Sequence, residues 1–178
     1  MFSQRIDAHI ELRMLDVADA TALYALVEAD RSALAQWLPW AENMSVQDES
    51  EFIQSFREKM ARYELWGAVI VVDQQVAGMI DLHAIDATNR RAEVGYWLAS
   101  AFQGRGVMTK ALASVEQIAF EEYHIDRLAI FVDTENEPSQ AVAKRRGFEQ
   151  EAVLKHYLWE HGQPRDMIVY VKLGATNN

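Results

Sequence analysis

The sequence predicts a mixed α/β or α+β fold that forms one domain. Three observations carry this prediction. The 178 residues are 50% hydrophobic, which is enough to bury a sizeable core. Segments with the alternation or the length of strands are interspersed with segments whose apolar residues recur at helical spacing. The resulting order, βααβββαβαββ, is broken by no internal repeat or linker, so we expect a single domain over residues 1–178.

The first part of the chain is predicted to form a strand and two helices. Residues 9–15 alternate between polar and apolar side chains, as a half-buried strand does. Asp16 is a typical helix N-cap, and Asp19 takes the place of the usual glutamate of a capping box. Apolar residues at helical spacing follow over residues 20–27. A second helix is expected over residues 45–62, with a serine as its N-cap.

Strands dominate the rest of the chain. A turn at residues 73–75 favours a hairpin, Gly147 is a typical residue at the end of a helix, and residues 161–164 join the last two strands. We expect strands at 65–72, 76–83 and 92–99, a helix at 106–122, a strand at 127–132, a helix at 139–146, and strands at 149–158 and 166–173.

The composition excludes several classes of function. A formal net charge of -10 disfavours nucleic acid as a partner, and it favours cationic partners such as amines only weakly, because an acidic surface also aids solubility. The absence of cysteine excludes disulfides, zinc ribbons, iron–sulfur clusters and a cysteine nucleophile. No spacing of His, Asp or Glu suggests a metal. The N-terminus does not read as a signal peptide, and the longest apolar run, residues 65–72, is too short to span a bilayer. We therefore expect no membrane partner and a cytoplasmic location.

Residues 93–109 are the most informative segment, because they read as a strand, a short loop, a glycine turn and the start of a helix. Gly104 and Gly106 leave backbone N–H groups unscreened by side chains. The helix start adds unpaired N–H groups and the positive end of its dipole. This arrangement predicts a site for a phosphate or pyrophosphate that needs no lysine.

Other interpretations of the glycine turn fit less well. A nucleotide P-loop needs Gly-x-x-x-x-Gly-Lys-Ser/Thr, which this chain lacks. A dinucleotide-binding turn needs a third glycine where Thr109 stands, and it should follow its strand directly, whereas this turn comes several residues after Leu98. A turn that binds nothing is the remaining alternative.

Five motifs in order extend over nearly the whole chain. Gln103 and Gly106 match the coenzyme A loop pattern Gln/Arg-x-x-Gly-x-Gly/Ala, although Met108 fills its final small position. On these residues the chain resembles the GCN5-related N-acetyltransferases, and within them the RimJ/RimL-type subgroup that acetylates the N-termini of ribosomal proteins. The other segments that resemble this subgroup are residues 89–98, residues 136–139 with 146–148, residues 37–41, and Gly162 with Asp166 and Tyr170.

The resemblance implies a fold and an activity. It implies one N-acetyltransferase domain with a central, mostly antiparallel mixed sheet, flanked by helices, whose fourth and fifth strands splay apart. It further implies that acetyl-CoA is the cofactor and that acetyl passes directly to a primary amine, most plausibly the N-terminal amine of a ribosomal protein. A small-amine acetyltransferase acting on a polyamine, amino acid or drug is the close alternative, and a non-catalytic coenzyme A-binding module is the alternative of another class. A homodimer is a further possibility, with the apolar segment 37–40 either at its contact or in the acceptor groove.

The resemblance also assigns site residues. Arg105, Lys110 and Lys144 are candidate phosphate contacts, although each also reads as a surface charge. Asn136 would either reach the cofactor or close a turn. The full set expected to bind the cofactor is Tyr96, Trp97, Leu98, Ala99, Gln103, Gly104, Arg105, Gly106, Val107, Met108, Thr109, Asn136, Ser139 and Lys144.

Two residues are expected to do the chemistry. Glu93 falls where the superfamily often places a catalytic glutamate, so we expect a general base acting through water. Its alternative is an outward-facing strand glutamate paired with Arg91 or another cation. Ala143 stands where many members have a tyrosine acid, which leaves Ser139 to protonate or hydrogen-bond the thiolate. The alternative for Ser139 is a helix N-cap.

Aromatic residues and a histidine are candidates for the acceptor side. Trp37, Trp40, His83 and Tyr157 would line it, although aromatic residues are more often part of a core and a lone histidine is more often structural. An α-amino group has a pKa of about 8, against about 10.4 for lysine, so roughly a tenth of it is neutral at pH 7. A weak base therefore suffices for an N-terminus.

Overall fold

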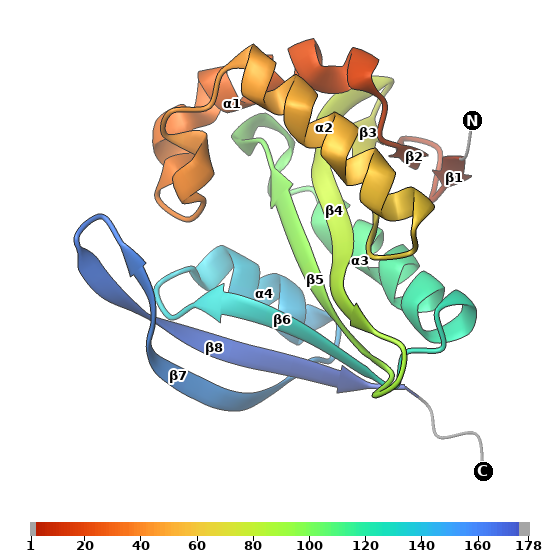
Figure 1. Cartoon of the computed structure of the whole chain (residues 1–178), viewed down its shortest axis with the longest axis vertical. Coiled ribbons are helices and arrows are strands. Elements are labelled where there is room, and N and C mark those ends of the chain that lie inside the picture. The colour runs from red at the N-terminus through yellow and green to blue at the C-terminus, as the bar shows by residue number, and fades with distance from the viewer. Residues whose placement is uncertain (1–2, 175–178) are drawn as a thin grey trace. The chain divides into compact units, whose positions relative to one another are not determined.

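The computed structural model describes residues 3–174, and its described strands form one eight-stranded sheet in the order β1-β2-β3-β4-β5-β6-β8-β7 (Figure 1). Strand β5 pairs with β6 in parallel, whereas β1 with β2, β2 with β3, β6 with β8 and β7 with β8 pair antiparallel. This arrangement confirms the predicted mixed, mostly antiparallel sheet. The strands are β1 (Ser3–Arg5), β2 (Ile10–Met14), β3 (Trp66–Val72), β4 (Gln75–Asp86), β5 (Arg91–Leu98), β6 (Arg127–Asp133), β7 (Glu149–Glu160) and β8 (Gln163–Leu173), and the α-helices are α1 (Ala20–Ala35), α2 (Val46–Ala61), α3 (Val107–Gln117) and α4 (Glu137–Arg145).

One compact unit comprises the described residues up to Asp81 together with Tyr96–Ala111. Its core joins Leu23 of α1 and Ile53 of α2 to Val69 of β3 and Met79 of β4, so the two helices lie against these strands (Figure 1). Nearly complete burial of such side chains stabilises the fold by roughly 1.5–3 kcal/mol each. The apolar residues that recur at helical spacing in the sequence are thus those by which α1 and α2 pack, and the strand-length apolar runs form β3 and β4.

Both predicted helix starts of this unit are capped by their own side chains. Ser45 and Asp48 form a reciprocal capping box at the start of α2. Asp16 and Asp19 form a second box, but it caps a short 3₁₀ turn, and α1 begins only at Ala20. The helix predicted to start directly after Asp16 therefore starts later, because the first residues adopt the tighter turn.

A second compact unit comprises Leu82–Gly95 and the described chain from Leu112 onward. Leu128, Ile130 and Tyr170 are almost fully buried on one face of its strands, and the Tyr170 hydroxyl donates to Gln140 of α4 at 3.3 Å. Helix α4 therefore packs on this face, beside β6 (Figure 1). The long hairpin of β7 and β8, blue in Figure 1, completes the unit.

A buried carboxylate links the helices of the second unit to its strands. Glu116 of α3 accepts hydrogen bonds from Arg146 at 2.9 Å and from Lys172 of β8 at 2.6 Å. Two cations compensate this nearly buried charge, and their three hydrogen bonds to it are charge-assisted. The network therefore connects α3 and the end of α4 to strand β8.

Three local features were not predicted from the sequence. The three-residue β1 is too short to show alternation, and it pairs antiparallel with β2. The predicted helix at 106–122 ends in a π-helical turn, Ile118–Glu122. Helix α4 begins at Glu137, two residues before the predicted start, and it ends as predicted before Gly147, whose φ is 75°.

The parallel pairing of β5 with β6 is short. It covers Arg91↔Arg127, Ala92↔Leu128 and Glu93↔Ala129, whereas β5 continues to Leu98. The pairing with β6 thus involves only the first three residues of β5. In the part of the chain that the structure describes, no helix is long and apolar enough to cross a membrane.

Candidate active site

The predicted glycine turn lies in the first unit, directly before a helix. Gly104 and Gly106 both have a φ of +73°, a region that residues with a Cβ rarely adopt. A Cβ at either position would meet no atom within 4 Å, so space beside the turn is open. Helix α3 begins immediately afterwards, at Val107, and the first N–H groups of a helix have no partner within it. Backbone groups and open space together suit a phosphate.

Two predicted cofactor side chains hold the turn in place. Gln103 donates its Nε2–H to the carbonyl of Leu98 at 2.8 Å, and Arg105 donates to the carbonyl of Ala101 at 3.0 Å. Val107 and Met108 are buried, so their side chains anchor the start of α3. Because these two side chains donate to backbone carbonyls, the groups of the turn that would bind an anion are its backbone N–H groups.

Lys110 is held by a carboxylate rather than by the turn. Its Nζ lies 2.7 Å from Oδ2 of Asp7. The hydrogen bond from Lys110, followed by that from the backbone N–H of His9, lowers the pKa of Asp7 from 3.8 to about 2. This lysine therefore already has an anionic partner in the protein, which weakens its case as a phosphate ligand.

The end of β5 is fixed on its β4 side. A Cβ on Gly78 would lie 2.2 Å from the Trp97 carbonyl oxygen, so only glycine permits this approach. The Ala99 N–H donates to the Ala77 carbonyl at 2.9 Å. Trp97 also packs against the core that α1 and α2 form with β3 and β4. The backbone of Tyr96–Ala99, which is expected to hold pantetheine, is thus well supported.

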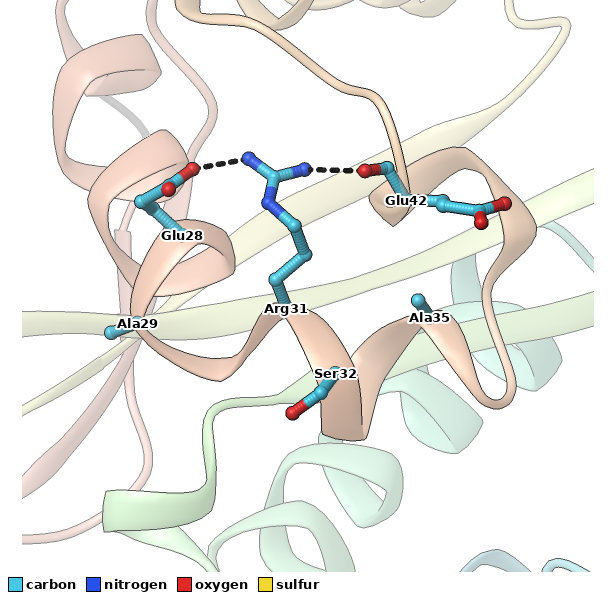
Figure 2. A pocket seen from close by; sticks show the side chains of 6 residues that line it. All are labelled: Glu28, Ala29, Arg31, Ser32, Ala35 and Glu42. Carbon is cyan, nitrogen blue, oxygen red and sulfur yellow. Dashed lines mark hydrogen bonds and ion pairs between the residues drawn. The ribbon is translucent and has the colours of Figure 1, made fainter.

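The predicted acceptor loop of this unit is tied to α1 by an arginine. Arg31 forms an ion pair with Glu28 and donates to the carbonyl of Glu42 (Figure 2), and it also donates to the carbonyls of Ala41 and Met44. The hydrogen bond that Arg31 donates to Glu28 raises the pKa of its guanidinium. The adjoining hollow is lined by Glu28, Ala29, Arg31, Ser32, Ala35 and Glu42.

The two predicted acceptor tryptophans lie in and beside this loop. Trp40 is 45% exposed and packs edge-on against Trp97, with ring centroids 6.1 Å apart. Trp37 is half-buried. Neither tryptophan lines the hollow beside Arg31.

In the second unit, the predicted general base lies beside a predicted acceptor residue. Nε2 of His83, on β4, is 3.4 Å from Oε2 of Glu93, on β5, and the two side chains are 44% and 37% exposed. The expected surface partner Arg91 instead pairs with Asp86 at 3.3 Å. Glu93 thus lies beside a histidine rather than beside Arg91.

Small and aromatic residues share the strand face of Glu93. Ala129 of β6 is its parallel register partner, and Phe131 follows on the same face. Tyr157, which is 51% exposed, stacks on Phe131 with centroids 5.5 Å apart and an interplanar angle of 21°. The sequence prediction included Tyr157 but missed Phe131. Strand alternation from Ala129 would have indicated it, had the β5–β6 register been known.

The structure separates the roles of Asn136 and Ser139. The Asn136 side chain accepts the Ser139 backbone N–H at 3.1 Å, so Asn136 is the N-cap of α4. The alternative that Ser139 is itself the N-cap is wrong. Ala143 is fully buried, and the Nζ of Lys144 lies 5.9 Å from the centroid of the Tyr170 ring. Lys144 therefore interacts with an aromatic ring of its own unit.

The glycine turn, with open space beside it and a helix starting directly after it, can accept a ligand that carries phosphate. The chain belongs to the GNAT acetyltransferase family, because the model described as Acetyltransferase (GNAT) domain matches residues 9–149.

Three relatives illustrate the similarity. A candidate ribosomal N-acetyltransferase of Bacillus subtilis (strain 168), YdaF, is 36% identical over 172 residues, or 96% of this chain and 94% of the relative. The structure of RimL, a ribosomal L7/L12 alpha-N-protein acetyltransferase in complex with coenzyme A, matches with a TM-score of 0.93 at 27% identity and covers 97% of this chain and 98% of RimL. A spermidine N(1)-acetyltransferase of Escherichia coli (strain K12) is 31% identical over 100 residues, or 56% of this chain and 54% of that relative.

Family membership establishes the enzyme class and the donor. The protein is an N-acetyltransferase that uses acetyl-CoA. The open glycine turn fits this donor, because its backbone N–H groups suit the phosphates of coenzyme A.

Proposed function

We propose that this N-acetyltransferase acts on the N-terminal amine of a protein, with a ribosomal protein as the first candidate. The observation that carries the proposal is the half-exposed Glu93 carboxylate beside Ala129, at the residue where the β5–β6 pairing ends. The ribosomal names of the similar proteins support the choice of acceptor. We further propose that residues 1–178 act as one acetyltransferase domain. Because ribosomal proteins are cytoplasmic, we place the reaction in the cytoplasm.

In the first unit, backbone groups would hold the donor. The N–H groups of residues 104–109 would bind the pyrophosphate of acetyl-CoA, with Gln103 fixing the loop. The exposed backbone of Tyr96–Ala99 would pair with the extended pantetheine arm. One N–H of this segment would hydrogen-bond the thioester oxygen, which is worth a few kcal/mol in the transition state.

In the second unit, Glu93 would accept the proton that the amine loses, through one water molecule. The nitrogen forms a bond to the acetyl carbon as the carbon–sulfur bond breaks, and Ser139 would hydrogen-bond or protonate the departing sulfur. A thiol has a reference pKa of about 8.5, so a weak acid is sufficient. The chain contains no cysteine, so direct transfer to the amine is the route we propose.

A small polyamine is the second candidate acceptor. The similarity to a spermidine N(1)-acetyltransferase and the net charge of -10 both favour a cationic small molecule. The two candidates differ in the amine they offer, because an α-amino group is partly neutral at pH 7 and a polyamine nitrogen is mostly protonated.

The test is release of free thiol from acetyl-CoA against a panel of amines. The panel contains peptides with free Ser, Ala or Met N-termini, the same peptides blocked but carrying lysine, and polyamines. The absence of cysteine keeps the thiol signal free of background from the protein. Activity on the free N-termini alone supports the proposal, and activity on polyamines alone refutes it. Light scattering on the same sample tests whether the protein forms the homodimer considered from the sequence.

A further inference from the structure

We propose that His83 is a positioning residue for Glu93, so that the two side chains act as one proton-accepting pair. This inference rests on the proposed role of Glu93 as the general base. The sequence segment that indicates Glu93, residues 89–98, does not include His83. The contact between Nε2 of His83 and Oε2 of Glu93, at 3.4 Å, is the observation that points to it.

The pair is held by the hairpin that joins β4 to β5. Asp86 accepts hydrogen bonds from the backbone N–H of Asn89 at 2.9 Å and from its side chain at 2.8 Å. The turn fixes the register of the two strands, which decides that residue 83 lies beside residue 93. A register shifted by one residue would place the two side chains on opposite faces.

Other charged groups around the pair have their own partners. Arg91, on the same strand face as Glu93, pairs with Asp86 at 3.3 Å. Arg127 of β6, the register partner of Arg91, is held by both oxygens of Glu151 at 2.6 Å. Asp81 precedes His83 by two residues on β4. Within residues 3–174, the ion pair of Glu93 is the one with His83.

The contact has a direct consequence for proton transfer. An N–H on Nε2 of His83, 3.4 Å from Oε2 of Glu93, would restrain the rotation of the carboxylate. Its other oxygen would then remain for the water that takes the amine proton. The His83 side chain would thus orient the base.

Kinetics on a set of variants test the inference. The set contains Glu93→Gln, His83→Ala, His83→Gln and the double variant Glu93→Gln/His83→Ala, assayed on whichever amine the panel shows to be acetylated. We expect His83→Ala to lower kcat about 10-fold with an unchanged KM for acetyl-CoA, because it loses orientation of the base. His83→Gln, which keeps an N–H donor of similar reach, should recover most of the rate. The double variant should be no slower than Glu93→Gln alone.

The matched control is His9→Ala. His9 forms a similar exposed pair, 2.6 Å from Asp73, in the first unit, and its loss should leave kcat unchanged. Thermal melting shows whether each variant is folded.

The outcomes separate this inference from the proposed function. Wild-type kcat in His83→Ala, or losses that add in the double variant, would overturn the positioning role while Glu93 keeps its own. Full activity of Glu93→Gln would overturn both. A panel that shows polyamine activity alone changes the acceptor, and the same variants then test the pair on the polyamine. An acceptor-independent measurement is the NMR signal of the His83 ring, which should move in Glu93→Gln, and an unmoved signal contradicts the contact.

Discussion

A buried carboxyl group on α2 gives the sharpest test of the fold. Glu49 lies one helical turn before Ile53, on the face that packs into the first unit, and only 3% of it is exposed. Within the described residues it forms no ion pair that would compensate its charge. Burial raises the pKa of Glu49 from 4.5 to about 7. The helix therefore carries a group whose ionisation opposes folding.

The change to make is Glu49→Gln, and its effect depends on pH. Below pH 4.5 the carboxyl is protonated in both states and contributes no difference. Between pH 4.5 and 7 the unfolded chain loses this proton while the folded chain keeps it, so the free energy of unfolding falls as the pH rises. Above pH 7 the penalty is complete and constant. Glutamine does not ionise, so the variant lacks this decline.

The magnitude follows from the pKa values. A difference of about 2.5 pKa units, at 1.36 kcal/mol each, corresponds to about 3 kcal/mol at full burial, and residual solvent screening reduces this to roughly 1–3 kcal/mol. We expect urea unfolding at several pH values to show that the variant gains this much on the wild type between pH 4.5 and pH 8. Any cost of burying the amide is a constant offset, so the pH dependence alone is diagnostic. Glu58→Gln, at an exposed position of the same helix, should show no such trend. A difference that is flat with pH for Glu49→Gln would refute the reasoning.

Three further predictions concern the turn, the strands and a surface carboxylate. Gly106→Ala and Gly162→Ala should each destabilise the protein by about 1 kcal/mol because both positions have positive φ, and calorimetry should show weaker acetyl-CoA binding only for Gly106→Ala. Gly78→Ala should cost roughly 1–3 kcal/mol in thermal unfolding, since its Cβ would lie 2.2 Å from the Trp97 carbonyl oxygen, and an unchanged Tm contradicts that approach. The lowered pKa of Asp7 contributes stability that is present above pH 3.8 and is lost as the pH falls toward about 2, so the advantage of the wild type over Asp7→Asn should shrink across that window in acid unfolding.

Features that depend on a few neighbouring residues could be predicted from the sequence. The capping box of Asp16 with Asp19 and the N-cap at Ser45 depend on residues within three positions, and the structure confirms both. The glycine turn before a helix was likewise predictable, because Gly104 and Gly106 stand directly before a helical pattern. The start of the first helix was harder to predict from the sequence, because the apolar residues of the 3₁₀ turn and of α1 follow the same spacing.

Features that depend on pairing between strands could not be read from the sequence. Phe131 was predicted only as part of a buried strand, since its position beside Ala129 matters only once Ala129 is known to oppose Glu93.

The start of α4 was ambiguous for a local reason. Asn136 and Ser139 are both good N-cap residues, and the backbone places the cap at Asn136.

The position of Glu93 shows how a local turn and a non-local register together build the candidate site. The Asp86–Asn89 contacts close the hairpin, so strand alternation brings His83 beside Glu93. The parallel pairing with β6 then ends at Glu93, opposite Ala129, so these two residues share one face of the strand pair. The hairpin joins residues that are near in the sequence, whereas β5 and β6 come from distant segments. The neighbours of the carboxylate are therefore set by strand pairing, which a local sequence motif does not specify.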